Sequence, residues 1–514
     1  MSFSSSSLTQ HCTADQPEET HADRLQIEYI ENAIHSIPHL YFSHTRDIVH
    51  SIQAQNTTKN LSVRDSLFVW NWKFLVPLLD ADVPREWIQP MIQGLVAVKE
   101  AVKVLDLDFD LILITRRATT HQGTRFNCRG LDSNGQAANF CETEQIALFR
   151  GATLEGTSAS FVIVRGSLPS AWTQQCSLIP VHQRARPDRD WSTKGFALFL
   201  QHLRTQMSRY GDRQVFVNLI DRKGTSNSSR DQAGLGKVFE NHVETLASTK
   251  QQTSPPPPKL VWFDFHHETK SGWENLGRLL DEVKPEVRGM GFFLWSPILP
   301  SLSTVQTGCF RVNCMDNLDR TNVVQSIIAR QSLLLLLSKI SHRDLSSSSS
   351  SVFDSGFESL ETAFKNLWAD NADAVSLVYA GSPALKTDFT RTGKRSFLGK
   401  MADGMNSATR LMVNNFFDAW RQDEIDVLLR DNDAVHAVLK RLSERRSSAS
   451  PYELLLDHIL MAKIRWGALV AMAIGYLSPF LSEQHRIPYL VALAAFAVFV
   501  IAKQASERPR FFRK

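Results

Sequence analysis

The sequence predicts a mixed α/β domain followed by a two-helix transmembrane hairpin. Short apolar runs at 111–115 (LILIT), 160–164 (SFVIV) and 215–220 (VFVNLI) alternate with helical stretches, which favours a sheet covered by helices. Two further segments, 466–481 and 487–502, each run for 16 residues without a formal charge. With 514 residues and 43% hydrophobic content, the chain is large enough to bury a substantial core.

The pattern along the chain divides it into five predicted parts. Residues 1–24 are polar and carry acidic residues, without the basic start and apolar stretch of a signal peptide, and predict a disordered tail. The other predicted parts are the α/β domain (25–438), a linker (439–462), the transmembrane hairpin (463–503) and a basic cytosolic tail (504–514).

Charges beside the two apolar segments predict how the hairpin is oriented. Lys463 and Arg465 precede the first segment, whereas only Arg486 lies in the loop between the segments. Five further Lys or Arg residues follow the second segment. Because positive charge stays on the cytosolic side, both ends of the hairpin and the preceding domain are expected to face the cytosol. A pair of buried helices is the alternative, and the lack of a polar face on either segment disfavours it.

Composition narrows the classes of partner and cofactor. The net charge of +4 is small for this length, and there is no basic and aromatic interleaving of the kind that binds nucleic acid. Six cysteines are spread along the chain without the spacing of a zinc site, so no metal and no cofactor is expected. Nothing in the sequence identifies a protein partner.

A candidate catalytic loop lies at 314–320, where Cys314 is followed after five residues by Arg320. The run before it, 308–312 (GCFRV), has strand character, and the residues after it have a helical pattern. The loop is therefore expected to join a strand to the N-terminus of a helix. Free backbone N–H groups and a partial positive charge at such an end suit a phosphate group and a thiolate.

This geometry would give each polar residue of the loop a role. Cys314 is expected to attack phosphorus and form a phosphocysteine, and Arg320 to hold two phosphate oxygens. Thr321 would donate to the sulfur or cap the helix, and Asp316 is the candidate general acid. Asp319 is expected to hold the loop by hydrogen bonds. A purely structural cysteine is the alternative reading, because C-x5-R alone is common.

The stretch 311–322 (RVNCMDNLDRTN) resembles the signature of the Sac family of phosphoinositide phosphatases, R-x-N-C-x-D-C-L-D-R-T-N. Asn317 stands where the family usually has a second cysteine. Further blocks, such as 66–71 (SLFVWN), 164–172 (VRGSLPSAW) and 364–395, are similar to Sac-domain segments in the same order, so that the resemblance covers about residues 28–430.

The resemblance implies a Sac-type cysteine phosphatase domain of the branch that is anchored in the endoplasmic reticulum and Golgi membranes. Its expected substrate is phosphatidylinositol 4-phosphate, with some action on other monophosphates such as the 3-phosphate. The resemblance also implies that an N-terminal subdomain of the family is mostly missing. Together with Asn317, this leaves open a catalytically weak or inactive membrane-anchored protein that binds phosphoinositides. A protein phosphatase with the same chemistry is a third possibility.

Five residues are expected to bind the substrate. Asn313, Asp319 and Asn322 belong to the signature, and Lys394 and Arg395 lie in the basic stretch 386–400, which would attract anionic lipid headgroups. A solvated loop is the alternative for that stretch.

Two other groups of polar residues each allow a structural and a functional interpretation. Arg116, Arg117 and Arg125 resemble family positions near the active-site face, but ion pairs with Glu142, Glu144 or Asp132 are favoured. Asp264, His266 and His267 follow an apolar run, where they could supply a second acid/base group or simply form a hydrogen-bonded strand end.

Overall fold

The computed structural model describes residues 37–441 except 60, 64–66, 82, 176–183, 249–256, 346–353, 393–395, 431, 432, 434 and 439, together with residues 24, 27, 30, 31 and 34. The predicted hairpin and basic tail, most of the predicted linker and N-terminal tail, and Lys394 and Arg395 lie outside the described residues.

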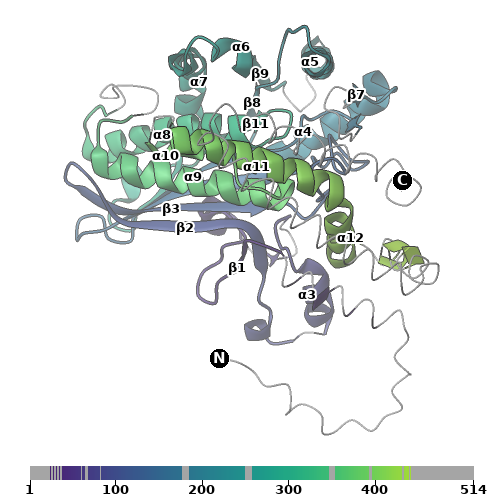
Figure 1. Ribbon diagram of the computed structural model, residues 1–514. Coiled ribbons are helices and arrows are strands. Elements are labelled where there is room, and N and C mark those ends of the chain that lie inside the picture. The colour runs from purple at the N-terminus through teal and green to yellow at the C-terminus, as the bar shows by residue number, and fades with distance from the viewer. Residues whose placement is uncertain are drawn as a thin grey trace, which may run out of the picture.

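A mixed sheet of nine strands forms the centre of the molecule (Figure 1). Its strand order is β1-β2-β3-β4-β5-β11-β8-β9, and β10 pairs with β5. The strands are β1 (Leu40–Phe42), β2 (Met91–Val104), β3 (Leu107–Arg117), β4 (Cys141–Phe149), β5 (Ser158–Arg165), β8 (Arg213–Asn218), β9 (Lys259–Trp262), β10 (Phe293–Trp295) and β11 (Gly308–Asn313). A separate two-stranded sheet pairs β6 (Trp172–Gln174) with β7 (Ala185–Pro187).

Helices cover the sheet and fill the connections between its strands (Figure 1). The α-helices are α2 (Ile52–Thr57), α3 (Trp72–Asp80), α4 (Phe196–Tyr210), α5 (Asn227–Ser248), α6 (Phe265–Glu268), α7 (Leu276–Met290), α8 (Asp319–Ser341), α9 (Glu358–Ala380), α10 (Thr387–Thr392), α11 (Phe397–Phe416) and α12 (Asp418–Leu429). The predicted mixed α/β fold is therefore confirmed, and the apolar runs quoted from the sequence overlap β3, β5, β8 and β11.

The sheet has an antiparallel half and a parallel half. Strands β1 to β5 pair antiparallel in sequence order. Strands β5, β11, β8 and β9 are parallel neighbours, and β8 reaches β9 through α5. Parallel strands need such crossovers, and their carboxyl ends meet at one edge, where α/β proteins place their ligands. The ends of β11, β8 and β9 thus bring three distant parts of the sequence together.

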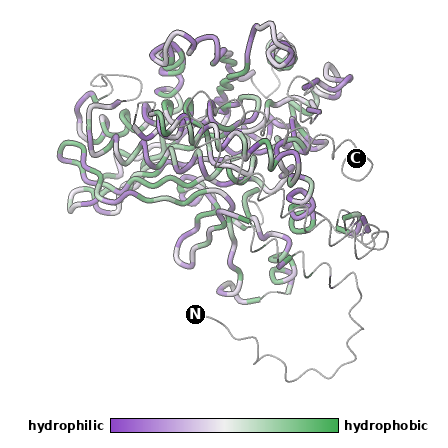
Figure 2. Tube along the Cα trace, viewed as in Figure 1, coloured by the Kyte–Doolittle hydropathy of each residue, from purple (hydrophilic) through white to green (hydrophobic). Residues whose placement is uncertain are grey.

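Both faces of the parallel half are buried, as alternation along β8 shows. Val215 and Val217 belong to the large hydrophobic cluster that includes residues of α7, α8 and α9. Phe216, between them, packs instead with Phe199 of α4 and Phe239 of α5. Figure 2 shows hydrophobic residues along the strands and helices in the middle of the molecule. The continuous apolar run in the sequence is what a strand covered on both faces requires.

Helix α8 runs through the core, beside α7 and α9 and against β5 and β11. Within the described part of the chain it is the one helix long and apolar enough to cross a membrane. Of its most apolar window, 83% is buried inside the protein. Such burial identifies a core helix, and it fixes the N-terminus of α8 at the carboxyl end of β11.

Candidate active site

The segment around Cys314 connects β11 directly to α8, as the sequence predicts. Cys314 follows the last residue of β11, and Arg320 is the second residue of α8. The backbone N–H of Asn317 donates to Cys314 Sγ at 3.1 Å, and the cysteine is only 2% exposed. An amide aimed at the sulfur and the positive end of α8 both stabilise negative charge on it.

Asn317 shapes this loop through its backbone. Its φ angle of 57° lies in the left-handed region, which asparagine tolerates better than most residues. The buried side chain donates from Nδ2 to the Asn139 carbonyl oxygen at 3.1 Å. The contact with the sulfur therefore comes from the main chain of residue 317 and requires no cysteine side chain there.

Asp316 is held by two arginines that lie nearly 200 positions away in the sequence. Arg125 forms a two-point contact with its carboxylate, through Nε at 3.0 Å and Nη2 at 2.6 Å. Arg129 Nη2 donates to the same carboxylate at 2.8 Å, and Arg129 Nη1 donates to the Met315 carbonyl oxygen at 3.0 Å. The two arginines thus fasten the beginning of the loop to the segment after β3.

These contacts argue against Asp316 as the general acid. Burial of the carboxyl raises its pKa, but the charges and hydrogen bonds of Arg125 and Arg129 outweigh burial and hold that pKa far below its usual range. A carboxylate kept ionised in this way has no proton to give to a leaving group. Both carboxylate oxygens of Asp316 already accept hydrogen bonds from arginines, so the structure gives no support to the role of general acid, which stays a prediction from the sequence.

Replacing Asp316 with asparagine is expected to destabilise the domain by about 2 kcal/mol, because it leaves the buried guanidinium of Arg129 without its countercharge. A carboxyl whose folded pKa is depressed stabilises fully above its unfolded pKa of about 4 and loses that effect as pH falls. The difference between wild type and Asp316→Asn in unfolding by urea should thus be constant above about pH 4 and shrink below it.

Asp281→Asn is the matched control for this measurement. Asp281 pairs with Lys284 at 3.1 Å on the surface, with 75% of its side chain exposed, so its loss should change little. Equal, small effects of the two substitutions would contradict the structural role of Asp316.

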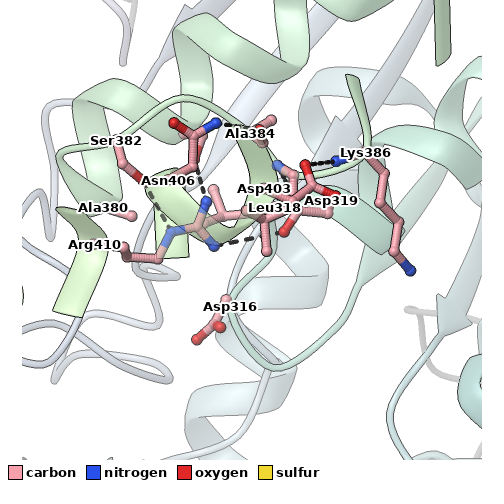
Figure 3. Close-up of polar contacts among 12 residues, drawn as sticks. Asp316, Leu318, Asp319, Ala380, Ser382, Ala384, Lys386, Asp403, Asn406 and Arg410 are labelled. Atoms are coloured by element: carbon pink, nitrogen blue, oxygen red, sulfur yellow. Dashed lines mark hydrogen bonds and ion pairs between the residues drawn. The ribbon is translucent and has the colours of Figure 1, made fainter. Parts of the chain in front are cut away.

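Asp319 ties the start of α8 to the segment that precedes α10 and to α11 (Figure 3). Its Oδ1 accepts from the Leu385 backbone N–H at 2.7 Å, and Arg410 Nη1 lies 3.5 Å from its Oδ2. Arg410 also donates to Ser382 Oγ at 3.1 Å. These contacts agree with the expected role of Asp319 in holding the loop. They leave its expected contact with the substrate without support.

The side chains of Asn313 and Asn322 also form hydrogen bonds with other residues of the protein. Asn313 is fully buried and exchanges hydrogen bonds with Asn218 and Arg311. Asn322 accepts from Arg165 Nη2 at 3.0 Å and donates to the Trp368 carbonyl oxygen at 2.9 Å. The amides of both asparagines join the loop to the surrounding core, and the substrate contacts expected of them stay a prediction.

Thr321 makes neither of its expected contacts. Its side chain is fully buried, and its hydroxyl has no hydrogen-bond partner among the described residues. Leu318 precedes α8 as its N-cap and provides no side-chain cap. The threonine hydroxyl therefore neither caps α8 nor donates to Cys314 in this structure.

Arg320 extends from α8 towards the end of β8. Its Nη1 donates to the Leu219 carbonyl oxygen at 3.2 Å and lies 3.7 Å from Asp221 Oδ1. The same oxygen of Asp221 is 2.8 Å from His266 Nδ1. The Arg320 side chain is 16% exposed. Arg320, Asp221 and His266 therefore form one cluster beyond the carboxyl ends of β8 and β9, and the loop from Cys314 to Arg320 joins this cluster to the end of β11.

The arginines of β3 and the segment after it divide into two groups. Arg116 forms the expected ion pairs with Glu142 at 2.7 Å and Glu144 at 2.8 Å, so its structural interpretation is confirmed. Arg117 donates instead to Gln93 and to the Gly123 carbonyl oxygen. Arg125 binds Asp316 and not Asp132, which brings it to the candidate site.

Sequence reasoning missed Arg129 and Asp221. Arg129 lies in the segment after β3, and its partner Asp316 is far away in the sequence. No local sequence pattern therefore reveals its role. Asp221 could have been found, because it comes directly after the apolar run that ends at Ile220. A polar residue just beyond a buried parallel strand is a common position for a functional group.

Comparison with known proteins identifies relatives along most of the chain. The SacI homology domain family matches residues 1–270. The phosphatidylinositol-3-phosphatase SAC1-B of Danio rerio is 36% identical over 406 residues, which are 77% of this chain and 64% of that protein. The phosphatidylinositol-3-phosphatase SAC1 of Drosophila melanogaster is 35% identical over 466 residues, 84% of this chain and 74% of the relative.

A plant protein gives a similar result. The phosphoinositide phosphatase SAC8 of Arabidopsis thaliana is 32% identical over 414 residues, 79% of this chain and 65% of the relative. The chain thus spans about two thirds of the length of such relatives. The family match and the identity over three quarters of the chain agree with the resemblance seen at 311–322. The chain therefore belongs to the Sac family of phosphoinositide phosphatases.

Proposed function

We propose that this protein is a metal-independent phosphoinositide phosphatase that hydrolyses the monoester phosphate of phosphatidylinositol 4-phosphate. The observation that carries the proposal is the position of Cys314 at the carboxyl end of β11, with the Asn317 N–H on its sulfur and Arg320 in the first turn of α8. One helix N-terminus thus carries a nucleophile, anion-stabilising amides and a guanidinium. A cysteine phosphatase needs these three groups.

In the proposed reaction the Cys314 thiolate attacks phosphorus, and a phosphocysteine forms as the inositol oxygen leaves. Backbone N–H groups at the start of α8 and the fork of Arg320 stabilise the charge on the phosphoryl oxygens. Water then attacks the phosphocysteine, which releases inorganic phosphate and restores the thiolate. Asp319, Asn313 and Asn322 support this reaction by positioning the loop and not by touching the substrate.

The position of the phosphate on the inositol ring is the finer part of the proposal. The Sac branch with a membrane anchor points to the 4-phosphate, whereas the names of the animal relatives specify the 3-phosphate. We expect the 4-phosphate to be preferred and the 3-phosphate to be accepted. Lys394 and Arg395, which lie outside the described residues, are proposed to contact the headgroup or the anionic membrane surface.

The proposed location follows from the two apolar segments 466–481 and 487–502. As a transmembrane hairpin they would anchor the domain to the endoplasmic reticulum or Golgi membrane with the candidate site in the cytosol. Tethering would keep Cys314 within reach of lipids in the cytosolic leaflet of that membrane.

The experiment that tests this function compares substrates in vesicles. The full chain is reconstituted and given phosphatidylinositol 3-, 4- or 5-phosphate or a phosphotyrosine peptide, always with EDTA, and inorganic phosphate is measured. We expect release from the 4-phosphate first and little from the peptide. Folded protein that releases no phosphate from any of the lipids would overturn the proposal and favour the non-catalytic alternative that the Asn317 substitution raised.

A further inference from the structure

Asp221 and His266 lie beside the candidate site without a role in the reaction described so far. Asp221 comes three residues after β8, and His266 follows the end of β9. Strands β9, β8 and β11 are consecutive parallel neighbours, so their carboxyl ends share one edge of the sheet. At a strand spacing of about 4.8 Å, the end of β9 lies roughly 10 Å from the end of β11. Side chains that reach inward from both ends can bridge that distance.

Asp221 connects the histidine to the catalytic arginine. Its Oδ1 is 2.8 Å from His266 Nδ1 and 3.7 Å from Arg320 Nη1, so one oxygen contacts both groups. Gln232 Nε2 donates to the other oxygen at 3.4 Å. Burial raises the pKa of Asp221, but His266, Ser229 and Arg320 outweigh it and hold that pKa below its usual value. The group is therefore an ionised carboxylate that contacts both the imidazole of His266 and the guanidinium of Arg320.

The imidazole is oriented but accessible. Its Nδ1 is occupied by Asp221, while 60% of the side chain is exposed. The short helix α6 that carries it is capped by Asp264, whose side chain accepts from the His267 N–H. An aspartate on one ring nitrogen fixes the ring and leaves Nε2 as the nitrogen that gives or takes a proton. This arrangement resembles the base and orienting carboxylate of other covalent catalysts.

The carboxyl groups nearer to the loop are less suitable as acids. Asp316 is kept ionised by Arg125 and Arg129. Burial raises the pKa of Asp418 to about 6, but that residue is 3% exposed and pairs with Arg421. Asp316 therefore has no proton to donate, and Asp418 is too buried to reach a substrate.

We propose that His266 is the general acid and general base of the reaction, and that Asp221 positions it beside Arg320. The inference rests on the proposed function and names a further catalytic residue for it. In the first step the P–S bond to Cys314 forms, the P–O bond to inositol breaks, and His266 Nε2 gives its proton to the departing oxygen. In the second step neutral His266 takes a proton from the attacking water as the P–S bond breaks.

Leaving-group dependence separates this role from a structural one. An inositol alkoxide needs a proton in order to leave, whereas nitrophenolate leaves readily without one. In full-length protein, His266→Gln should lower kcat/KM for phosphatidylinositol 4-phosphate vesicles by roughly 10²-fold to 10⁴-fold. The same variant should lose less than about tenfold on p-nitrophenyl phosphate. Asp221→Asn should give the same pattern with a smaller loss on the lipid.

His267→Gln is the matched control on the same helix. Its side chain is 78% exposed, and its ring faces Glu268 at 3.6 Å instead of Asp221, so both activities should stay at the wild-type level. Equal losses of His266→Gln on the two substrates, or lipid turnover close to wild type, would overturn the inference and leave the proposed function standing. Wild-type protein that hydrolyses neither substrate would overturn the proposed function itself, and this inference with it.

Discussion

Replacing Cys314 with serine is expected to lower phosphate release from phosphatidylinositol 4-phosphate by about 10⁴-fold or more. The serine hydroxyl takes the place of the thiol and can still accept from the Asn317 N–H, which donates to the sulfur at 3.1 Å. The fold should therefore persist while the nucleophile is lost. Initial rates on vesicles with EDTA, measured beside thermal unfolding of the same samples, check this expectation.

Cys128→Ser is the matched control for the nucleophile. Cys128 is also buried, and its sulfur donates to the Gln122 carbonyl oxygen at 3.6 Å, a contact that serine can keep. This variant should retain wild-type turnover. Turnover by Cys314→Ser at the level of Cys128→Ser would show that Cys314 is not the nucleophile.

Replacing Arg320 with lysine is expected to cost roughly 10³-fold in kcat/KM on the same vesicles. Lysine keeps the positive charge but lacks the planar fork that binds two phosphoryl oxygens at once. It also loses the geometry by which Arg320 meets the Leu219 carbonyl oxygen and Asp221. The loss should appear mainly in kcat, because the fork acts on charge that develops in the transition state.

Arg343→Lys gives the control for a change of cation. Arg343 follows the far end of α8, with 62% of its side chain exposed and its guanidinium 4.0 Å from Asp106. This substitution should leave turnover unchanged. A rate for Arg320→Lys within tenfold of wild type would argue that the guanidinium does not hold the phosphoryl group.

The sheet and the position of the loop could be predicted from the sequence because their signals are local. Val215, Phe216 and Val217 form a continuous apolar run that a strand with two buried faces requires, and the structure places them in β8. The strand before Cys314 and the helix after it are likewise visible in adjacent residues. Cys314 and Arg320 could therefore be placed at a strand-to-helix junction from the sequence alone.

The roles of the other loop residues could not be predicted, because their partners come from elsewhere in the sequence. The spacing of the loop suggests that Asp316 is a free acid, but Arg125 and Arg129 both donate hydrogen bonds to its carboxylate. The sequence suggests Asn313 and Asn322 as substrate ligands, whereas in the structure their amides form hydrogen bonds within the core. Local spacing reveals which side chains are near a loop but not which of them remain available.

Asn317 illustrates the opposite case, in which a departure from the family signature has a local explanation. Its left-handed backbone suits asparagine, and its side-chain amide gains a hydrogen bond to Asn139. The N–H that faces Cys314 belongs to the backbone and is present with any residue that adopts this conformation. The substitution is therefore compatible with catalysis.

The most direct test of the account measures turnover and lipid binding on the same phosphatidylinositol 4-phosphate vesicles, with EDTA present and wild type beside Cys314→Ser. The account predicts that both proteins bind the vesicles and that only wild type releases inorganic phosphate. Wild-type protein that is folded and bound to the vesicles, yet releases no phosphate, would contradict it.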